Sequence, residues 1–165
     1  MAIQVGDKIP SVVLKKLDES GLKDQSTDEI FKNRNVVLFG VPGAFSPTCS
    51  LKHLPGYIEN LPAFKELGID VVCMAVNDPF VMSAWTRFAK AEEITMLADG
   101  NATFTKALGL RLDGTSYGLG QRCQRFALYA ENGIVKIVAV EKPGAFEVSD
   151  AEEMLKAVRD KKAAD

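Results

Sequence analysis

Clusters of metal-binding residues are almost absent from this sequence. It holds a single histidine, His53, and three cysteines, Cys49, Cys73 and Cys123, with no Cys-x-x-Cys pair. A zinc site would have to be assembled from scattered ligands, and a disulfide reductase would lack its usual pair of neighbouring thiols. An odd number of cysteines also disfavours the disulfide framework of a small secreted protein. We therefore expect no metal and no cofactor, and at least one cysteine whose presence needs explanation.

An excess of charge of one sign is also missing. Twenty Lys and Arg face 22 Asp and Glu, for a formal net charge of −2. Such a chain offers no overall field to attract a polyanion or an anionic membrane surface. The N-terminus lacks the charged and then apolar run of a signal peptide, and no apolar stretch is long enough to span a bilayer. We expect a soluble cytoplasmic protein, or an organellar one if a targeting peptide was removed, with neither nucleic acid nor membrane as a partner.

No linker, repeat or low-complexity stretch divides the chain, so we predict one domain over residues 1–165. Two apolar runs rich in β-branched residues, 36–41 and 70–76, are typical of strands buried on both faces. Between them, helical spacing is shared by Leu51, Leu54, Ile58 and Leu61. Strand, helix and strand in this order predict a parallel βαβ unit. Pro55 falls within the helix, which we therefore expect to be kinked or divided there.

The remaining segments predict a mixed sheet. A small N-terminal β-hairpin is indicated over residues 12–21, and a short strand followed by a brief helix over residues 94–108. Asn132-Gly133 stands between the apolar runs 125–130 and 134–139, which is the strongest short signal for an antiparallel hairpin. The expected fold class is therefore α/β, with a mixed central sheet flanked by helices.

Two helices have recognisable starting signals. Asp78-Pro79 gives a capping residue followed by proline, ahead of an apolar stripe formed by Val81, Ala84, Trp85 and Phe88. Ser149 and Glu152 have the spacing of a capping box, and an amphipathic segment rich in Lys and Arg at its end follows them. We predict helices after both signals.

The most informative stretch for chemistry runs from Pro42 to Cys49, directly after the first buried run. Ser46 is a good N-cap and Pro47 a good first helical residue, which places Thr48 and Cys49 in the first helical turn. Backbone N–H groups there lack helical partners and stabilise a thiolate, so Cys49 is a candidate nucleophile. The alternative is that Cys49 is only a small buried residue at a strand-to-helix junction.

This stretch resembles the signature of the peroxiredoxin family, in which a proline, a threonine and a reactive cysteine stand at fixed spacing. Pro42, Ser46 and Cys49 match those positions, and Pro42-Gly-Ala-Phe-Ser-Pro-Thr-Cys-Ser50 is similar to the peroxiredoxin 5, or type II, branch. The resemblance continues through His53-Leu-Pro-Gly56, Val76-Asn-Asp-Pro-Phe80, Ala98-Asp99 and Arg125-Phe126. It implies a thioredoxin-like fold and a thiol-dependent peroxidase that reduces hydrogen peroxide and organic hydroperoxides through a sulfenic acid on Cys49.

The resemblance also implies roles for individual residues. Arg125 would hold the thiolate and polarise the peroxide, the Ser46 hydroxyl would hydrogen-bond the substrate, and Pro42 would shield the sulfur from water. The pocket for substrate would be lined by Gly43, Phe45, Thr48 and Leu119. Without the resemblance, Arg125 would be better interpreted as a solvated arginine at the start of a strand.

Three further features near the motif need interpretation. Most of the family has threonine where Ser46 stands, and serine lacks the methyl group that limits rotamers, so we expect a slightly looser site. His53 lies one helical turn after Cys49, where it could act as a base, but a preformed thiolate needs none and we favour a structural role. Gly118-x-Gly120 does not join a strand to a helix, so we interpret it as a flexible loop rather than a phosphate site.

A sulfenic acid must be reduced before it oxidises further. Cys73 matches the second cysteine of plant-like and some bacterial members, so it is a candidate resolving cysteine. Those members are commonly reduced by glutaredoxin with glutathione or by thioredoxin. The place of Cys73 in the middle of an apolar run makes burial, and hence low reactivity, the favoured interpretation. Cys123 matches no family position and is either a spare thiol or an unusual resolving cysteine. We expect a cycle of one cysteine, Cys49, with an external thiol as reductant.

The resemblance further implies a homodimer in which the active-site ends of two subunits meet. Phe45 and Phe80 are candidates for that interface, although apolar residues there could equally belong to the core. An alternative function is a peroxide sensor or redox relay, in which oxidised Cys49 passes its state to a partner protein.

Overall fold

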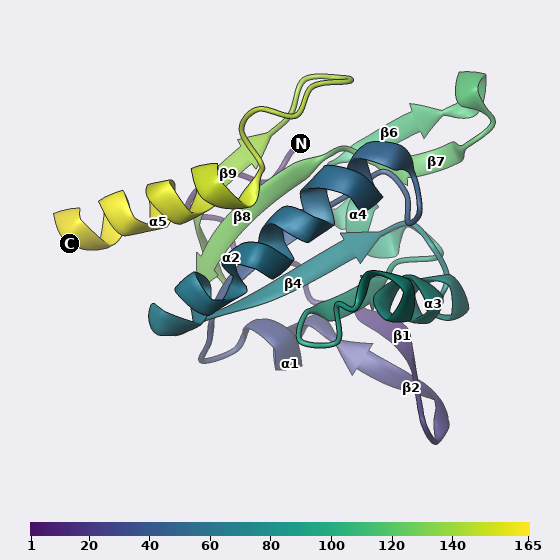
Figure 1. Cartoon of the computed structure of the whole chain (residues 1–165), viewed down its shortest axis with the longest axis horizontal. Coiled ribbons are helices and arrows are strands. Elements are labelled where there is room, and N and C mark those ends of the chain that lie inside the picture. Colours follow the sequence, from purple (N-terminus) through teal and green to yellow (C-terminus); the bar gives the residue numbers. More distant parts are fainter.

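The computed structural model describes residues 1–165, and its main feature is one seven-stranded sheet. The strands are β1 (Val13–Asp18), β2 (Gly21–Ser26), β3 (Asn35–Gly40), β4 (Ile69–Ala75), β5 (Thr95–Ala98), β8 (Phe126–Glu131) and β9 (Ile134–Val140). Their order across the sheet is β2-β1-β5-β4-β3-β8-β9 (Figure 1). β3, β4 and β5 are parallel, whereas the other neighbouring pairs are antiparallel. The predicted α/β fold with a mixed sheet is confirmed.

Side chains of the central strands alternate between two buried clusters, one on each face of the sheet. Val37 and Phe39 belong to the first, which is covered by α2 (Leu54–Glu66), α3 (Pro79–Ala89) and α5 (Ala151–Ala164). Figure 1 shows α2 and α5 side by side on this face. Val36 and Leu38 belong to the second cluster, which α1 (Thr27–Phe31) and α4 (Thr103–Leu108) cover. None of the helices is both long and apolar enough to cross a membrane.

The helix after the informative stretch is divided, as predicted, but one turn before the expected place. Cys49–His53 form a π-helical turn in which the Leu54 N–H donates to the Cys49 carbonyl five residues earlier. Pro55 lacks an N–H, and its ring would crowd the carbonyl four residues before it in a regular α-helix. A π turn directly ahead of the proline relieves that conflict, and such turns are frequent at functional sites.

Two residues that we assigned to buried helical stripes are exposed, so those assignments were wrong. Leu51 is 75% exposed, because the π turn rotates it away from the face on which Leu54 and Tyr57 are buried. Phe88 is 71% exposed, and its ring lies 5.5 Å from that of Phe45 rather than in the core. Buried contacts of α3 come instead from Met82 and Trp85.

Most of the local signals act as predicted. Asp78 caps α3 by accepting a hydrogen bond of 2.8 Å from the Val81 N–H. Asn132 and Gly133 both have positive φ, which is the type I′ geometry that an Asn-Gly turn between β8 and β9 requires. The cap of α5 differs from the prediction, because Asp150 occupies the N-cap position. Ser149 instead donates its hydroxyl to the Glu141 carboxylate at 2.7 Å.

A two-stranded ribbon lies apart from the main sheet and was not predicted. It consists of β6 (Arg111–Gly114) and β7 (Gly120–Cys123), which are antiparallel. The segment around Gly118 that we interpreted as a flexible loop is the connection of this ribbon and contains a 3₁₀ turn, Thr115–Tyr117. Arg125 follows directly after the ribbon, so this hairpin leads the chain into the site described below.

Gly40→Ala is expected to lower the free energy of unfolding by about 1–3 kcal/mol. Gly40 pairs with Phe126 across β3 and β8, and an added Cβ would lie 2.1 Å from Cε1 of the buried Phe126 ring. Gly56→Ala is a matched control, because its added Cβ would make an ordinary contact of 3.9 Å with Ala151. Urea unfolding of both variants measures the difference, and equal stabilities would contradict the close packing of Phe126 on Gly40.

Candidate active site

Cys49 is fully buried and lies in the first turn of the helix that follows β3, as predicted. The helix begins at Pro47, and the Ser50 N–H donates to the Ser46 carbonyl at 2.9 Å. The sulfur accepts a hydrogen bond of 3.2 Å from Nη2 of Arg125. A free N-terminal helical turn on one side and a cation on the other favour the ionised, nucleophilic form of a thiol.

Arg125 reaches this sulfur from the segment between β7 and β8. Its second terminal nitrogen, Nη1, lies 2.9 Å from Nδ1 of His53, and its guanidinium carbon lies 5.7 Å from the ring centre of Phe146. No carboxylate forms an ion pair with Arg125. Its positive charge is therefore free to act on the sulfur and on any group that approaches it. Because Arg125 is half-buried and bonded to Cys49 and His53, the interpretation as a solvated arginine was wrong.

His53 is a hydrogen-bond acceptor for Arg125. Its Nε2 lies 3.0 Å from the Ser149 carbonyl, which can only accept, so Nε2 carries the proton and Nδ1 is left as the acceptor. Burial and, second, the neighbouring charge of Arg125 lower the pKa of His53 to about 3. The neutral imidazole is consistent with the structural role that we favoured over that of a base, and the structure adds its contact with Arg125.

The remaining residues of the motif lie in the loop between β3 and Cys49. Ser46 stands directly before the first helical residue, as predicted, but its hydroxyl donates to the Gly43 carbonyl at 2.7 Å instead of capping the helix. Its oxygen lone pairs remain free to accept a hydrogen bond. Pro42 and Thr48 are half-buried, and Gly43 is buried.

Arg122 joins the ribbon to the segment that follows β4. Its Nε donates to the Leu119 carbonyl at 2.9 Å and its Nη1 to the Val76 carbonyl at 3.2 Å. The same Nη1 would lie 3.2 Å from a Cβ on Gly43. Arg122 therefore links the backbone of Leu119, in the connection between β6 and β7, to that of Val76, and it packs beside Gly43. Nothing in the local sequence distinguishes Arg122 from an ordinary strand arginine.

The loop ahead of Cys49 is braced against α3. Asn77 accepts a hydrogen bond of 2.9 Å from the Ala44 N–H, and Trp85 Nε1 donates to the Ser50 hydroxyl at 3.0 Å. Phe45 has a φ of 66°, which is unfavourable for a residue with a Cβ. Its ring nevertheless packs 6.5 Å from that of Trp85. These contacts hold the loop in a conformation that it would not adopt alone.

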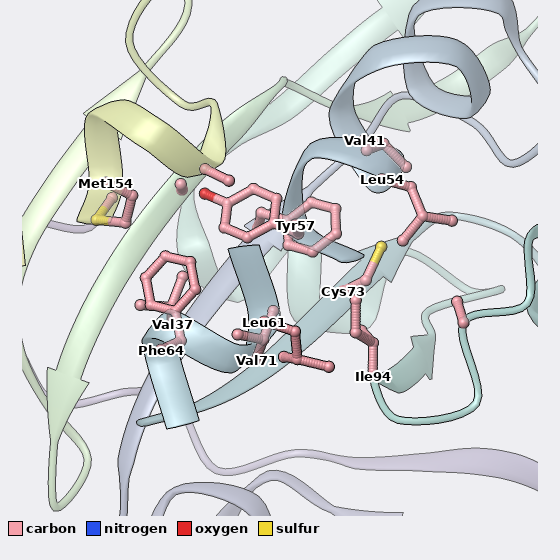
Figure 2. Close-up of a cluster of buried hydrophobic side chains, with 14 of the residues drawn as sticks. Val37, Val41, Leu54, Tyr57, Leu61, Phe64, Val71, Cys73, Ile94 and Met154 are labelled. Atoms are coloured by element: carbon pink, nitrogen blue, oxygen red, sulfur yellow. The ribbon is translucent and has the colours of Figure 1, made fainter. Parts of the chain in front are cut away.

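The other two cysteines have no comparable surroundings. Cys73 lies in the middle of β4 among apolar side chains such as Leu54 and Ile94 (Figure 2), and burial raises its pKa well above the ordinary value. Cys123 donates its thiol to the Val41 carbonyl at 3.1 Å, and burial raises its pKa to about 12. Both are free, buried and protonated, so Cys49 is the thiol that this arrangement activates. No three His, Cys, Asp or Glu side chains are grouped so that they could hold a metal ion.

Comparisons with known proteins agree with this geometry. The family model described as Redoxin matches residues 4–155. Peroxiredoxin-2C of Oryza sativa subsp. japonica is 46% identical over 159 residues, which cover 94% of this chain and 98% of the relative. The crystal structure of reduced Prx3 in complex with H₂O₂ from Vibrio vulnificus is 47% identical with a TM-score of 0.91, covering 94% of this chain and 99% of that one. Peroxiredoxin 5 from Alvinella pompejana is 34% identical with a TM-score of 0.85, covering 96% and 99%.

The site and the comparisons lead to the same classification. A cysteine at a helix start, held by an unpaired arginine, stands in a fold that matches solved peroxiredoxins over nearly the whole chain. The chain therefore belongs to the redoxin family and, within it, to the peroxiredoxins similar to the type II and peroxiredoxin 5 proteins, which are thiol-dependent peroxidases with a thioredoxin-like fold.

Proposed function

We propose that this peroxidase reduces hydrogen peroxide and organic hydroperoxides at Cys49 and is regenerated by an external thiol, supplied by glutaredoxin with glutathione or by thioredoxin. The observation that carries the proposal is the hydrogen bond of 3.2 Å from Arg125 Nη2 to the Cys49 sulfur. It joins the only cysteine at a helix start to a cation that no carboxylate neutralises.

The chemical step is a displacement at oxygen. The Cys49 thiolate attacks one peroxide oxygen in line with the O–O bond, so a sulfur–oxygen bond forms as the O–O bond breaks. The sulfur is oxidised to a sulfenic acid, and the leaving oxygen takes up a proton to give water or an alcohol. Arg125 stabilises the negative charge that develops on the leaving oxygen, because its charge is already in position.

Ser46 and Pro42 complete the proposed roles. The Ser46 hydroxyl donates to Gly43, so it can accept the hydroperoxide O–H and orient the substrate. Pro42, half-buried at the start of the same loop, excludes water from the sulfur. The walls of the substrate pocket are Gly43, Phe45, Thr48 and Leu119.

Ser46→Thr is expected to raise the second-order rate constant with hydrogen peroxide by about two- to threefold, because the added methyl group limits the rotamers of the hydroxyl. Stopped-flow oxidation of the reduced protein measures the change. Ser20→Thr is a matched control, because it adds the same methyl group to an exposed serine in the turn between β1 and β2 and should leave the rate unchanged. An unchanged rate in Ser46→Thr would show that the serine is already held firmly by Gly43.

The external reductant is proposed because neither remaining cysteine is activated to resolve the sulfenic acid. Cys73 and Cys123 are buried, and burial raises the pKa of each thiol, so little thiolate is present at neutral pH. We assign the recycling step to a thiol that enters from solvent.

We also propose that two copies associate as a homodimer near the active site. Phe45 and Phe80 are 46% and 58% exposed, so the alternative that they belong to the core was wrong. The exposed ring of Phe88 also lies 5.5 Å from that of Phe45, and exposed aromatic side chains are typical of protein interfaces. The molar mass in solution, from sedimentation equilibrium, tests this assignment.

The proposed cycle is tested by giving the reduced protein one equivalent of hydrogen peroxide and locating the oxidised residue by mass spectrometry. Oxidation is expected only at Cys49, and the Cys73→Ser and Cys123→Ser variants are expected to keep turnover with glutaredoxin and glutathione or with thioredoxin. Slow oxidation spread over three thiols would overturn the assignment of Cys49. Loss of turnover in Cys73→Ser would overturn the external reductant, and fast oxidation without turnover would instead favour a sensor.

A further inference from the structure

Glu141 is a buried acid that the proposed chemistry does not use. It follows β9 directly, is 6% exposed and forms no ion pair. Its carboxylate oxygen Oε2 accepts hydrogen bonds from the N–H groups of Glu147, Val148 and Ser149 at 2.9, 2.8 and 2.8 Å. The Ser149 hydroxyl adds a fourth at 2.7 Å. A side chain that gathers four donors from one short segment fixes the conformation of that segment.

The segment fixed by Glu141 holds His53 in place. The Ser149 carbonyl accepts hydrogen bonds from His53 Nε2 at 3.0 Å and from the Tyr57 hydroxyl at 2.8 Å. Phe146, from the same segment, lies against His53 with 5.0 Å between the ring centres and also against the guanidinium of Arg125. The position of the imidazole, and with it the direction of Nδ1, therefore depends on this segment.

The main chain of Glu141 also contacts the main chain of Arg125. The Glu141 N–H donates to the Arg125 carbonyl at 2.9 Å, where β8 and β9 continue past their last paired residues. The connections thus form a closed ring: Glu141 holds the Arg125 backbone directly, and holds its guanidinium through Ser149 and His53. A ring of this kind leaves Arg125 little freedom to turn away from Cys49.

We propose that Glu141 is a positioning residue of the peroxidase reaction, which acts through Ser149 and His53 to aim the guanidinium of Arg125 at the Cys49 sulfur. This inference rests on the role of Arg125 in the proposed function. Burial opposes ionisation of Glu141, but the hydrogen bonds from Glu147, Ser149 and Val148 outweigh it and lower the pKa of the carboxyl group, so the anion persists at neutral pH.

Glu141→Gln tests the proposal with little change in shape. The amide oxygen can replace Oε2 but carries no charge, and the amide NH₂ must then face the Glu147 N–H, which lies 3.0 Å from Oε1. Because small displacements of a catalytic group are costly, we expect the rate constant for Cys49 oxidation by hydrogen peroxide to fall by about 10- to 100-fold. The pH profile of that reaction is expected to move towards higher pH.

Glu147→Gln is the matched control, because it makes the same chemical change in the same segment but its exposed side chain takes no part in the ring. Its rate is expected to equal that of the wild type. Ser149→Ala is a second, milder variant that removes only the hydroxyl donor to Glu141, and it should slow the reaction in the same direction. Circular dichroism and thermal unfolding verify that each variant is folded. If Glu141→Gln does not fold, the rate of Ser149→Ala tests the proposal in its place.

Combination with Arg125→Ala separates positioning from a general loss of structure. If Glu141 acts through Arg125, Glu141→Gln will lower the rate in the wild type but not in the Arg125→Ala background. Equal losses in both backgrounds, or a Glu141→Gln rate equal to that of Glu147→Gln, would overturn the inference and leave the role of Arg125 intact. An Arg125→Ala protein that reacts as fast as the wild type would instead overturn the proposed function.

Discussion

Arg125→Ala is expected to slow the oxidation of Cys49 by hydrogen peroxide by about 10²- to 10³-fold, the usual cost of removing one preorganised donor to a developing charge. Two contributions act in the same direction. The hydrogen bond of 3.2 Å to the sulfur disappears, and with it the stabilisation of the thiolate. The leaving oxygen also loses the cation that hydrogen-bonds the sulfur. Stopped-flow measurement of sulfenic acid formation gives the rate, and the Cys49→Ser variant, which cannot form this product, supplies the blank signal.

Arg125→Lys separates charge from geometry. A lysine retains the positive charge but cannot bond both the Cys49 sulfur and His53 Nδ1, as the two terminal nitrogens of Arg125 do. We expect an intermediate rate. Arg159→Ala, which removes an exposed arginine from α5, is the control for net charge and should change nothing. A wild-type rate in Arg125→Ala would remove the arginine from the mechanism.

The parts of the fold that could be predicted are those with strong local patterns. The β-branched runs of β3 and β4, the Asn132-Gly133 turn and the cap at Asp78 each specify their element within a few residues. Helix α1 has only five residues, and β6–β7 is polar and lies apart from the sheet, so neither shows a clear period. Leu51 was misplaced because a π turn changes the helical phase, which a period of 3.6 residues cannot anticipate.

The candidate site was predictable only where one continuous stretch carries it. Cys49, Ser46 and Pro42 lie within eight residues, and Arg125 could be added through the resemblance alone. The contact of Arg125 with His53 could not be predicted in the same way, because the two residues lie 72 positions apart. His53 in turn is held by Ser149, 96 positions away, and these residues meet only when the sheet is complete. Ser149 was assigned to a helix cap for the same reason, since its contact with Glu141 is not visible in a local pattern.

The buried, neutral state of His53 has a consequence for stability at acid pH. Burial, and then the charge of Arg125, lowers the pKa of His53 from its ordinary value of 6.5 to about 3. Between these values the unfolded chain binds a proton that the native protein does not, so the free energy of unfolding rises with pH in this window. The contribution of His53 to the free energy of unfolding is therefore complete above about pH 6.5 and falls by about 1.4 kcal/mol for each pH unit below it.

His53→Gln is expected to remove this pH dependence. From about pH 6.5 to about pH 5, the free energy of unfolding of the wild type should fall by about 2 kcal/mol more than that of the variant, as measured by urea unfolding at each pH.

The other groups around the imidazole do not produce the same pH dependence. Glu141 stays ionised because its pKa is lowered, and Tyr57 stays neutral because burial raises its pKa. Burial also raises the pKa of Asp150, but this acid is present in both proteins and cancels in the difference. Equal slopes would mean that the native protein can protonate His53, and then its Nδ1 could not accept the hydrogen bond that directs Arg125 towards Cys49.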